Sequence, residues 1–267
     1  MTTATALPDD LPLEGIAVGE GPALVLLHGA GVDLDLWTPQ MPAFAACYRV
    51  IALNLPGHGD SPMVSGGVPA MADAVMQTLD ALGIQRAAFM GLSLGGMVAL
   101  EIAGRWPDRA THLIMVEAVP FVAATSWGQR LMEAAILPLR LIPPRWLAKL
   151  PAKSMGAETE EAGRYVKIAL AKMTAANTHR ILRDALRYDG RPRLAQVTAP
   201  TLVMVGAANP ATHSRAQVAA DGIQNAQFEV VPNAGHILNR DAAAHFTARS
   251  LAFLETPTTV GGSASAC

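Results

Sequence analysis

The segment that most constrains the fold is the motif GLSLGG at residues 91–96, which lies within the run AAFMGLSLGGMVALEIA. An apolar stretch typical of a strand stops at a serine flanked by glycines, and an apolar stretch typical of a helix begins at once. This pattern predicts a nucleophile elbow, a sharp turn that points the hydroxyl of Ser93 into a cleft. Glycines remove the Cβ atoms where strand and helix crowd together. The helix N-terminus behind Ser93 offers free N–H groups to a developing oxyanion.

The composition is that of one large α/β domain. The chain has 267 residues, of which 51% are apolar, so a substantial core can be buried. The net charge of −2 gives no general reason to expect a nucleic acid or an anionic membrane surface as partner. The sequence contains no His-x-x-x-His or Cys-x-x-Cys spacing and no G-x-x-x-x-G-K-[ST] phosphate loop. We therefore expect neither a metal nor an organic cofactor.

The cysteines and the N-terminus favour a cytoplasmic protein. Cys47 and Cys267 do not form a disulfide framework by their spacing, and a reducing compartment is the simplest interpretation. The N-terminal run MTTATALPDDLP has neither a basic nor an apolar region of a signal peptide. The longest apolar run, 87–104, contains the serine motif and Glu101, so a buried strand, turn and helix are expected there rather than a membrane span.

Short apolar runs alternate with longer amphipathic segments, which predicts a mostly parallel twisted sheet with helices on both faces. Strands are expected at 23–28, 49–54, 87–92, 112–117, 201–206 and 226–232, with an additional antiparallel strand within 12–18. Helices are expected at 34–46, 69–82, 95–105, 211–220 and 240–254.

The alternation stops between about 120 and 190. This stretch is rich in proline, reads as three or four short helices without strands, and is interpreted as a helical lid, or cap, inserted after the strand that ends at Glu117. The α/β core is then formed by 1–119 and 191–254. The remaining residues, 255–267, have the composition of a disordered tail.

A serine hydroxyl needs a base to remove its proton, and His236 is the expected one. It follows the last predicted strand, in the run VVPNAGHILNRD, and so lies at the carboxyl edge of the sheet where α/β proteins build their sites. His213, at the start of a predicted helix, is the alternative. The order nucleophile, acid, histidine along the chain also favours His236.

The oxyanion requires two backbone N–H groups. One is expected from Leu94, the residue after the serine, and the other from the loop LLHGAGVDLDLW after the first parallel strand. Ala30 is the favoured donor in that loop and Gly29 the alternative. His28 is expected to hydrogen-bond to this loop rather than act as a base, and His58 to organise a neighbouring turn.

Four motifs, HGAG, LPGHGDS, GLSLGG and PNAGH, resemble in order and spacing the α/β-hydrolase superfamily with a lid domain. The resemblance covers about residues 12–254. It implies the α/β-hydrolase fold, a Ser93–His236 pair and the oxyanion hole described above. It does not specify the substrate.

The third member of the triad departs from the usual pattern. Most members of the superfamily have an aspartate after the strand that follows the lid, where this chain has Asn209 in TLVMVGAANP. The acid is therefore expected one strand earlier, at Glu117, as in certain haloalkane dehalogenases and the fungal zearalenone lactonases. A glutamate at a buried strand end is costly unless it is paired, and a histidine that becomes cationic is a natural partner. The alternatives are Asn209 as an orienting group, and Asp33 or Asp35 as the acid.

These residues predict a serine hydrolase that cleaves a carboxylic ester or lactone, with a hydrophobic small molecule as substrate and a zearalenone-type lactone as one option. The substrate pocket is expected to include residues of the lid and of the histidine loop: Trp127, Met155, Phe121 and Ile237. The alternatives are a carbon–carbon bond hydrolase, a thioesterase or a perhydrolase on the same triad, and a non-catalytic ligand-binding protein. The sequence predicts no oligomeric state.

Overall fold

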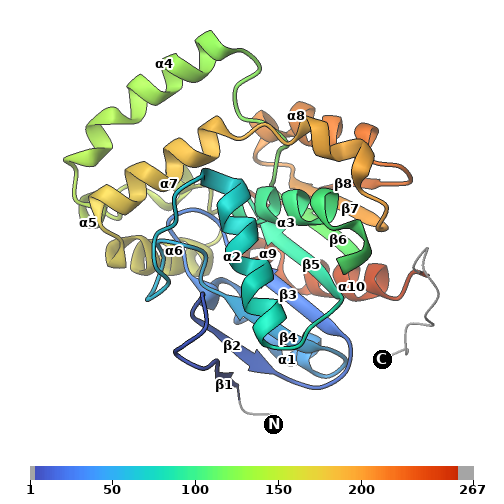
Figure 1. The fold of residues 1–267 in the computed structure, drawn as a ribbon. Helices are drawn as coiled ribbons and strands as arrows, with labels where there is room; N and C mark the ends of the chain where they lie inside the picture. Colours follow the sequence, from blue (N-terminus) through green and yellow to red (C-terminus); the bar gives the residue numbers. More distant parts are fainter. Residues whose placement is uncertain (1–3, 258–267) are drawn as a thin grey trace.

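A computed structural model describes residues 4–257 and contains one eight-stranded sheet (Figure 1). The spatial order of the strands is β1-β2-β4-β3-β5-β6-β7-β8. Their bounds are β1 (Thr5–Ala6), β2 (Gly15–Val18), β3 (Ala23–Leu27), β4 (Arg49–Leu53), β5 (Ala87–Leu92), β6 (Ala110–Val116), β7 (Thr201–Gly206) and β8 (Gln227–Val231).

The sheet is parallel from β4 to β8 and antiparallel only at one edge, where β2 pairs with β1 and β4. The α/β-hydrolase fold predicted from the sequence is confirmed, including the antiparallel strand within 12–18. The two-residue β1 was not predicted, because so short a segment carries no periodic signal.

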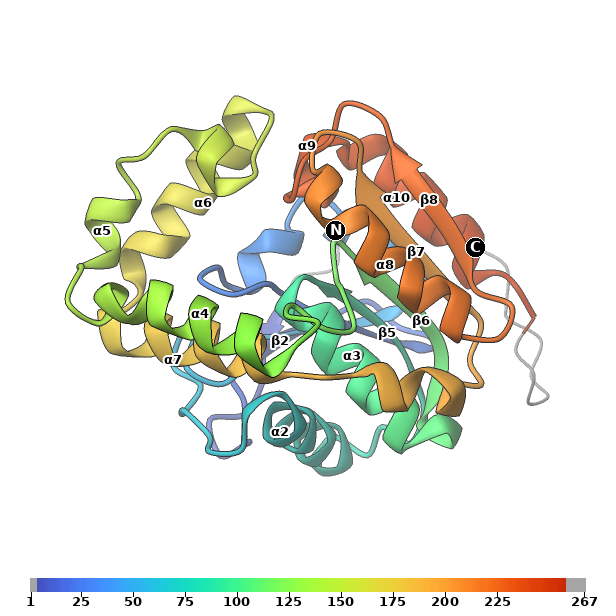
Figure 2. The ribbon, with the colours of Figure 1, turned by 90° about the horizontal axis from the view of Figure 1, so that it is seen from above.

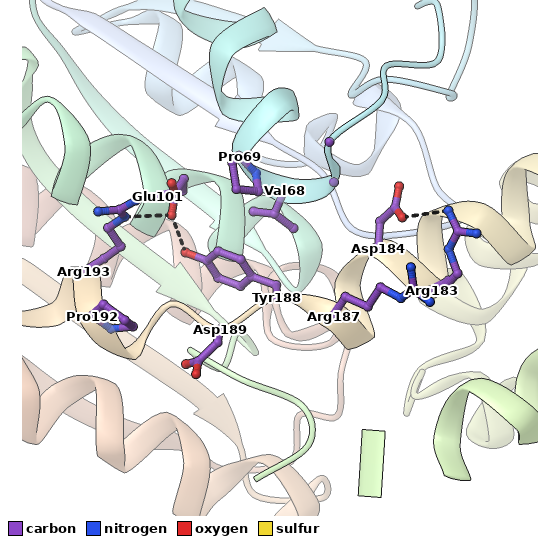
Figure 3. Close-up of a pocket in the computed structure, with 12 residues that line it drawn as sticks. Val68, Pro69, Glu101, Arg183, Asp184, Arg187, Tyr188, Asp189, Pro192 and Arg193 are labelled. Carbon is purple, nitrogen blue, oxygen red and sulfur yellow. Dashed lines mark hydrogen bonds and ion pairs between the residues drawn. The ribbon is translucent and has the colours of Figure 1, made fainter. Parts of the chain in front are cut away.

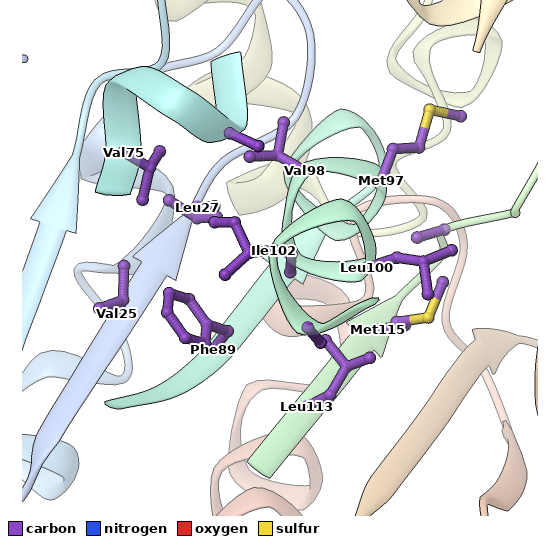
Figure 4. Packing of buried hydrophobic residues seen from close by; sticks show 14 of the residues in the cluster. Val25, Leu27, Val75, Phe89, Met97, Val98, Leu100, Ile102, Leu113 and Met115 are labelled. Carbon is purple, nitrogen blue, oxygen red and sulfur yellow. The ribbon is translucent and has the colours of Figure 1, made fainter. Parts of the chain in front are cut away.

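Helices cover both faces of the sheet. Their bounds in the core are α1 (Met41–Ala45), α2 (Gly67–Ala81), α3 (Leu94–Arg105), α8 (Pro210–Gly222), α9 (Leu238–Asp241) and α10 (Ala243–Leu254). One hydrophobic cluster lies between the sheet and α2, α3 and α8, and a second lies between the opposite face and α1, α9 and α10. Figure 4 shows the first cluster, where Ile102 of α3 lies beside Phe89 of β5 and Leu100 of α3 lies beside Met115 of β6.

Two predicted helices are interrupted. The segment predicted as 34–46 consists of a 3₁₀ turn, η1 (Leu34–Trp37), followed by α1, and Pro39 lies between them. Proline has no N–H to donate to an acceptor one turn earlier, which interrupts the helical hydrogen-bond pattern at this point. The segment predicted as 240–254 is interrupted at Ala242, between α9 and α10, where φ is −124° and ψ is 45° and the backbone is not helical.

The segment between β6 and β7 contains helices and no strand among its residues, all of which are described, apart from a single bridge between Phe121 and Asp189. We call α4 to α7 the inserted helices. They are α4 (Ser126–Ile136), η3 (Leu137–Arg140), α5 (Pro144–Leu147), η4 (Ala152–Met155), α6 (Glu160–Lys172) and α7 (Ala175–Arg187), followed by η5 (Arg191–Gln196) and preceded by η2 (Pro107–Arg109) in the core. Figure 2 shows them at one side of the sheet. The Phe121–Asp189 bridge joins the two chain segments that lead into and out of them.

Three further observations concern the sequence expectations. Cys47 is not a free thiol, and the expectation that Cys47 and Cys267 form no disulfide framework involves position 267, which lies outside the described residues. Within residues 4–257, no helix combines the length and the apolar content that a membrane crossing requires. The predicted disordered tail, 255–267, falls largely on positions 258–267, which are outside the described residues.

Candidate active site

Ser93 occupies a strained turn between β5 and α3. Its φ of 54° and ψ of −113° are backbone angles that residues with a side chain rarely adopt. The turn is tight enough that a Cβ on Gly91 would clash with the backbone of Gly95, and a Cβ on Gly95 would clash with the carbonyl of Leu27. The glycines of the motif are therefore required by close backbone approach, as the sequence predicted.

His236 lies in the loop that follows β8, on the same side of the sheet as Ser93. The start of its side chain packs against Gly156, which has a φ of 80°, and a Cβ on Gly156 would lie only 2.4 Å from Cβ of His236. The N–H of Ile237 donates to the carbonyl of Gly156 at 3.2 Å. The inserted helices thus support the histidine loop directly.

Glu117 follows β6 and is the buried carboxylate of the site, with 2% of its surface exposed. Its Oε2 lies 3.3 Å from Nδ1 of His236. The same oxygen accepts hydrogen bonds from Nδ2 of Asn209 at 2.6 Å and Oγ1 of Thr212 at 3.0 Å, and Oε1 accepts from the N–H of Gly206. Like Ser93, Glu117 has a positive φ, 48°. Strained residues thus stand at the carboxyl ends of two adjacent strands, where strain is characteristic of functional sites.

Asn209 lies beside Glu117 and His236 and directs its NH₂ group, a hydrogen-bond donor, at both of them. Its Nδ2 is 3.4 Å from Nδ1 of His236, and an ionised Glu117 can only accept hydrogen bonds. The carboxylate therefore fixes the amide so that NH₂, and not the carbonyl oxygen, is directed at the site. An amide in this orientation cannot accept a hydrogen bond from Nδ1–H of the imidazole. Asn209 therefore hydrogen-bonds to the Glu117 carboxylate as a donor.

A cavity of about 160 Å³ joins the serine and the histidine. It is lined by Gly29, Ala30, Gly31, Val32, Leu92, Ser93, Met155, Val166, Leu170, His236 and Ile237. Of the four pocket residues predicted from the sequence, Met155 and Ile237 lie here. Trp127 is 67% exposed on α4, and Phe121 is buried at the bridge with Asp189, so neither lines this cavity.

The loop after β3 approaches the serine closely. A Cβ on Gly29 would lie 3.4 Å from Cβ of Ser93 and 2.9 Å from Cδ2 of Leu92. Within residues 4–257, the N–H groups of Ala30 and Leu94 have no hydrogen-bond acceptor. The N–H of Gly31 is already used, because it donates to Nε2 of His58 at 3.1 Å. This arrangement leaves the two predicted oxyanion donors available.

Two buried histidines, His28 and His58, support the loop after β3 through hydrogen bonds. Nε2 of His28 accepts from the N–H of Leu55 at 2.9 Å, and Nε2 of His58 accepts from Gly31. Their rings meet edge to face with centroids 4.6 Å apart. Burial lowers the pKa of His28 to about 4, and burial together with the neighbouring His28 lowers the pKa of His58 to about 3. Both imidazoles are therefore neutral acceptors at pH 7, and neither is placed to act on Ser93.

Helix α6 holds the other side of the same loop. The hydroxyl of Tyr165 contacts Oδ1 and the carbonyl of Asp33, each at 2.9 Å, and Nζ of Lys172 lies 2.7 Å from Oδ2 of the same aspartate. Burial and the adjacent carboxylate raise the pKa of Tyr165 well above its usual value. Asp33, which was an alternative acid, is thus bound to α6 and does not contact His236.

The carboxylate of Asp241 joins the N-terminus of α6 to the histidine loop. Its Oδ1 accepts from the N–H groups of Glu158 and Thr159 at 3.0 and 2.9 Å, and its Oδ2 accepts from the N–H of Gly235 at 3.0 Å. The neighbouring Arg240 donates to the carbonyl of Leu36 and stacks 3.8 Å from the ring centre of Tyr165. These residues carry no functional signal in the sequence, because only the fold brings them together.

A second cavity, of about 570 Å³, lies at the junction of α2, α3 and the end of α7 (Figure 3). Glu101 on α3 is 2% exposed there, and its Oε2 accepts from the hydroxyl of Tyr188 and Nε of Arg193, each at 3.1 Å. This cavity contains none of the predicted catalytic residues. Its contacts connect the helix that follows Ser93 to the segment that leaves the inserted helices.

The other candidate groups lie apart from the serine. Nε2 of His213, the alternative base, is 2.9 Å from the carbonyl of Gly206, and His213 does not line the Ser93 cavity. Across the described part of the chain, no group of three or more His, Cys, Asp or Glu side chains has a geometry suited to a metal ion.

This fold and this arrangement of serine, histidine and buried carboxylate define an α/β hydrolase. Residues 24–249 match the model of the Alpha/beta hydrolase family, which is most of the chain, and the protein belongs to that family.

Several known proteins are similar over most of this chain. It is 32% identical over 255 residues to the dihydrolipoyllysine-residue acetyltransferase component of the acetoin cleaving system of Pseudomonas putida, covering 88% of this chain and 64% of that longer protein. It is 32% identical to a putative carbamate hydrolase of Variovorax paradoxus, covering 88% of this chain and 92% of the relative. The enol-lactonase of Burkholderia xenovorans superposes with a TM-score of 0.75 at 25% identity, covering 91% and 97% of the two chains.

Proposed function

We propose that this protein is a serine hydrolase of carboxylic esters or lactones, in which Ser93 is the nucleophile, His236 the general base and Glu117 the acid. The observation that carries the proposal is the 3.3 Å contact between Glu117 and Nδ1 of His236, made by a histidine that shares a cavity with Ser93. An imidazole held through Nδ1 presents Nε2 as the base, which is the geometry that activates a serine.

In the first half of the reaction, Oγ of Ser93 attacks the carbonyl carbon while its proton moves to Nε2 of His236. The N–H groups of Leu94 and Ala30 hold the resulting oxyanion, with Gly29 as the alternative to Ala30. The bond to the leaving oxygen then breaks, and that oxygen takes the proton from Nε2. An acyl-serine and the free alcohol result, or a ring-opened hydroxyacyl group when the substrate is a lactone.

In the second half, a water molecule gives its proton to Nε2 of His236 and attacks the acyl carbon. The tetrahedral intermediate collapses, Oγ of Ser93 recovers its proton, and a carboxylic acid leaves. Each half-reaction passes through an imidazolium. The buried Glu117 carboxylate stabilises this cation, because it is already hydrogen-bonded by Asn209 and Thr212 and needs no reorganisation.

The cavity favours a small apolar acyl group. Val32, Leu92, Met155, Val166, Leu170 and Ile237 provide its apolar wall, and the volume of about 160 Å³ holds only a few carbon atoms beyond the ester. The similarity to an enol-lactonase supports testing small lactones first. A macrolactone of the zearalenone type is a second substrate to test, because the position of Glu117 resembles that of the acid in the zearalenone lactonases.

The test is hydrolysis of short-chain p-nitrophenyl esters and of a lactone panel scored by acid release. Wild type is expected to turn over esters of two to four acyl carbons, and Ser93→Ala is expected to lose activity to the background rate. Thr38→Ala, an exposed hydroxyl next to η1, is the matched control for loss of a hydroxyl. Absence of turnover on every ester and lactone would contradict the proposal and favour a non-catalytic ligand-binding role.

A further inference from the structure

The outer segment of the inserted helices, residues 126–150, has an unusual surface. Ten large hydrophobic side chains are exposed within residues 4–257, and seven of them lie in this segment. They are Trp127, Leu131, Met132, Leu137, Leu141, Trp146 and Leu150, with 38 to 88% of their surface exposed. No side chain of α4 is buried. An exposed apolar surface of this density marks an interaction site.

The apolar face of α4 is directed away from the rest of the protein. Its polar side chains Gln129 and Glu133 are linked at 3.0 Å, and Arg187 of α7 donates to both oxygens of Glu133 at 2.8 and 2.7 Å. At 3.6 residues per turn, Trp127 and Leu131 lie about 120° and 160° around the helix from Glu133. Figure 1 shows α4 at the outer edge, with α7 between it and α2. The polar face is therefore bound to α7 and the apolar face is free.

The same segment is strongly basic, which the net charge of −2 conceals. It contains four exposed cations, Arg130, Arg140, Arg145 and Lys149, and a single acid, Glu133, which is already paired with Arg187. Within the described residues, Arg130, Arg145 and Lys149 form no ion pair or hydrogen bond through their side chains. Exposed tryptophan and leucine beside unpaired cations are the composition of helices that lie at a lipid interface.

We propose that residues 126–150 form a docking surface for an anionic lipid bilayer. The apolar side chains enter the acyl–headgroup boundary, and the four cations bind lipid phosphate. The unpaired cations of this segment favour an anionic bilayer as the partner, because neither a neutral bilayer nor an apolar protein groove requires positive charge. Docking would place the Ser93 cavity near amphipathic esters dissolved in the membrane. The proposal concerns binding and is independent of whether Ser93 is the nucleophile.

The test is co-sedimentation of the full chain with vesicles of phosphatidylcholine alone or with phosphatidylcholine mixed with phosphatidylglycerol. Binding is expected only to the anionic vesicles, with a blue shift of tryptophan emission and loss of binding at high salt. The triple variant Arg130→Glu/Arg145→Glu/Lys149→Glu is expected to bind at least about 100-fold more weakly. Arg130→Lys/Arg145→Lys keeps the charges and is expected to bind as wild type does. Leu131→Ala/Leu141→Ala/Trp146→Ala is expected to bind more weakly while hydrolysing soluble esters normally.

Three results would overturn the proposal. The first is no binding, or equal binding to both vesicles. The second is an altered KM for soluble esters in the apolar variant with unchanged vesicle binding, which would place these side chains at the substrate entrance. The third is a wild-type dimer in sedimentation velocity that the apolar variant abolishes, together with unchanged vesicle binding, which would identify a second copy as the partner. None of these side chains is buried, so the variants are expected to fold.

Discussion

Oε2 of Glu117 and Nδ1 of His236 lie 3.3 Å apart, although 119 positions separate the two residues in the sequence. Asn209 occupies the position at which the resemblance to the superfamily predicts an aspartate. Its Nδ2 donates to the same oxygen of Glu117 at 2.6 Å. The carboxylate thus follows β6, one strand before β7 and the amide in the sequence, and the amide donates a hydrogen bond to it.

The first prediction separates these two residues. Glu117→Gln is expected to lower kcat for a p-nitrophenyl ester by about 1000-fold or more, because a neutral amide cannot stabilise the imidazolium and can force the wrong tautomer. Asn209→Ala removes one of several donors to Glu117 and is expected to lower kcat by about tenfold at most. Steady-state kinetics at pH 7 to 9 checks both. Near-full activity of Glu117→Gln would show that the acid is elsewhere.

The second prediction concerns pH. The pKa values of His28 and His58 are about 4 and about 3 in the folded protein, against 6.5 in the unfolded chain. The unfolded state therefore binds more protons below pH 6.5, and each histidine reduces the stability as the pH falls through that window, by about 1 kcal/mol per pH unit. Urea unfolding of wild type and His58→Gln between pH 5 and 6.5 measures this contribution.

The His58→Gln substitution keeps an acceptor for the N–H of Gly31 but removes the titrating group, so the variant is expected to lose stability more gradually with falling pH. His245→Gln, an exposed histidine paired with Glu229, is the control. Equal slopes for wild type and His58→Gln would exclude the depressed pKa.

The third prediction concerns Tyr165, whose hydroxyl contacts Asp33 in the loop of the proposed oxyanion donor Ala30. Tyr165→Phe keeps the ring under Arg240 and removes only the hydroxyl. It is expected to lower kcat about tenfold with little change in KM, because a looser loop weakens binding of the oxyanion and not of the ground state. A boronic acid inhibitor, which forms a tetrahedral adduct, is expected to lose affinity by a similar factor. If Tyr165→Phe instead raised KM and left kcat unchanged, the positioning role would be contradicted.

Much of the architecture could be predicted from the sequence because each signal is local. The GLSLGG motif, the alternation of apolar runs and the glycines around Ser93 each act within a few residues, and the described sheet agrees with them. The candidates for the acid could be limited to Glu117 and a few alternatives from the resemblance to the superfamily, and because a buried carboxylate requires a partner.

The contacts that position the site could not be predicted in the same manner. Tyr165 and Asp33 are 132 positions apart, and Asp241 and Thr159 are 82 apart. Each is an ordinary polar residue in its own segment, and only the packing of α6 against the two loops gives it a partner. Trp127, which we predicted to lie in the pocket, is exposed on α4 and does not line the Ser93 cavity. Periodicity does not determine which side of an inserted helix faces the site.

The fourth prediction concerns Tyr188, whose hydroxyl donates to the buried Glu101 near the second cavity. Tyr188→Phe is expected to lower the free energy of unfolding by about 2 kcal/mol, since a buried hydrogen bond to a charged group is lost. Activity at room temperature is expected to remain normal, because neither residue lines the Ser93 cavity. Tyr48→Phe is the control, as Tyr48 is equally buried but its hydroxyl has no hydrogen bond within residues 4–257. Equal stability of the two variants would contradict the assigned contact.

The fifth prediction concerns Asp241, which accepts hydrogen bonds from both α6 and the histidine loop. In Asp241→Asn, one oxygen becomes an NH₂ group and must face an N–H donor, so one side of the connection is lost. Because Gly235 immediately precedes His236, we expect kcat to fall by about tenfold or more and the KM to change little. The same substitution at the exposed Asp221 of α8 is the control. If the two variants have the same kcat, Asp241 stabilises α6 without positioning the histidine. The substitution would then lower only the Tm in thermal unfolding.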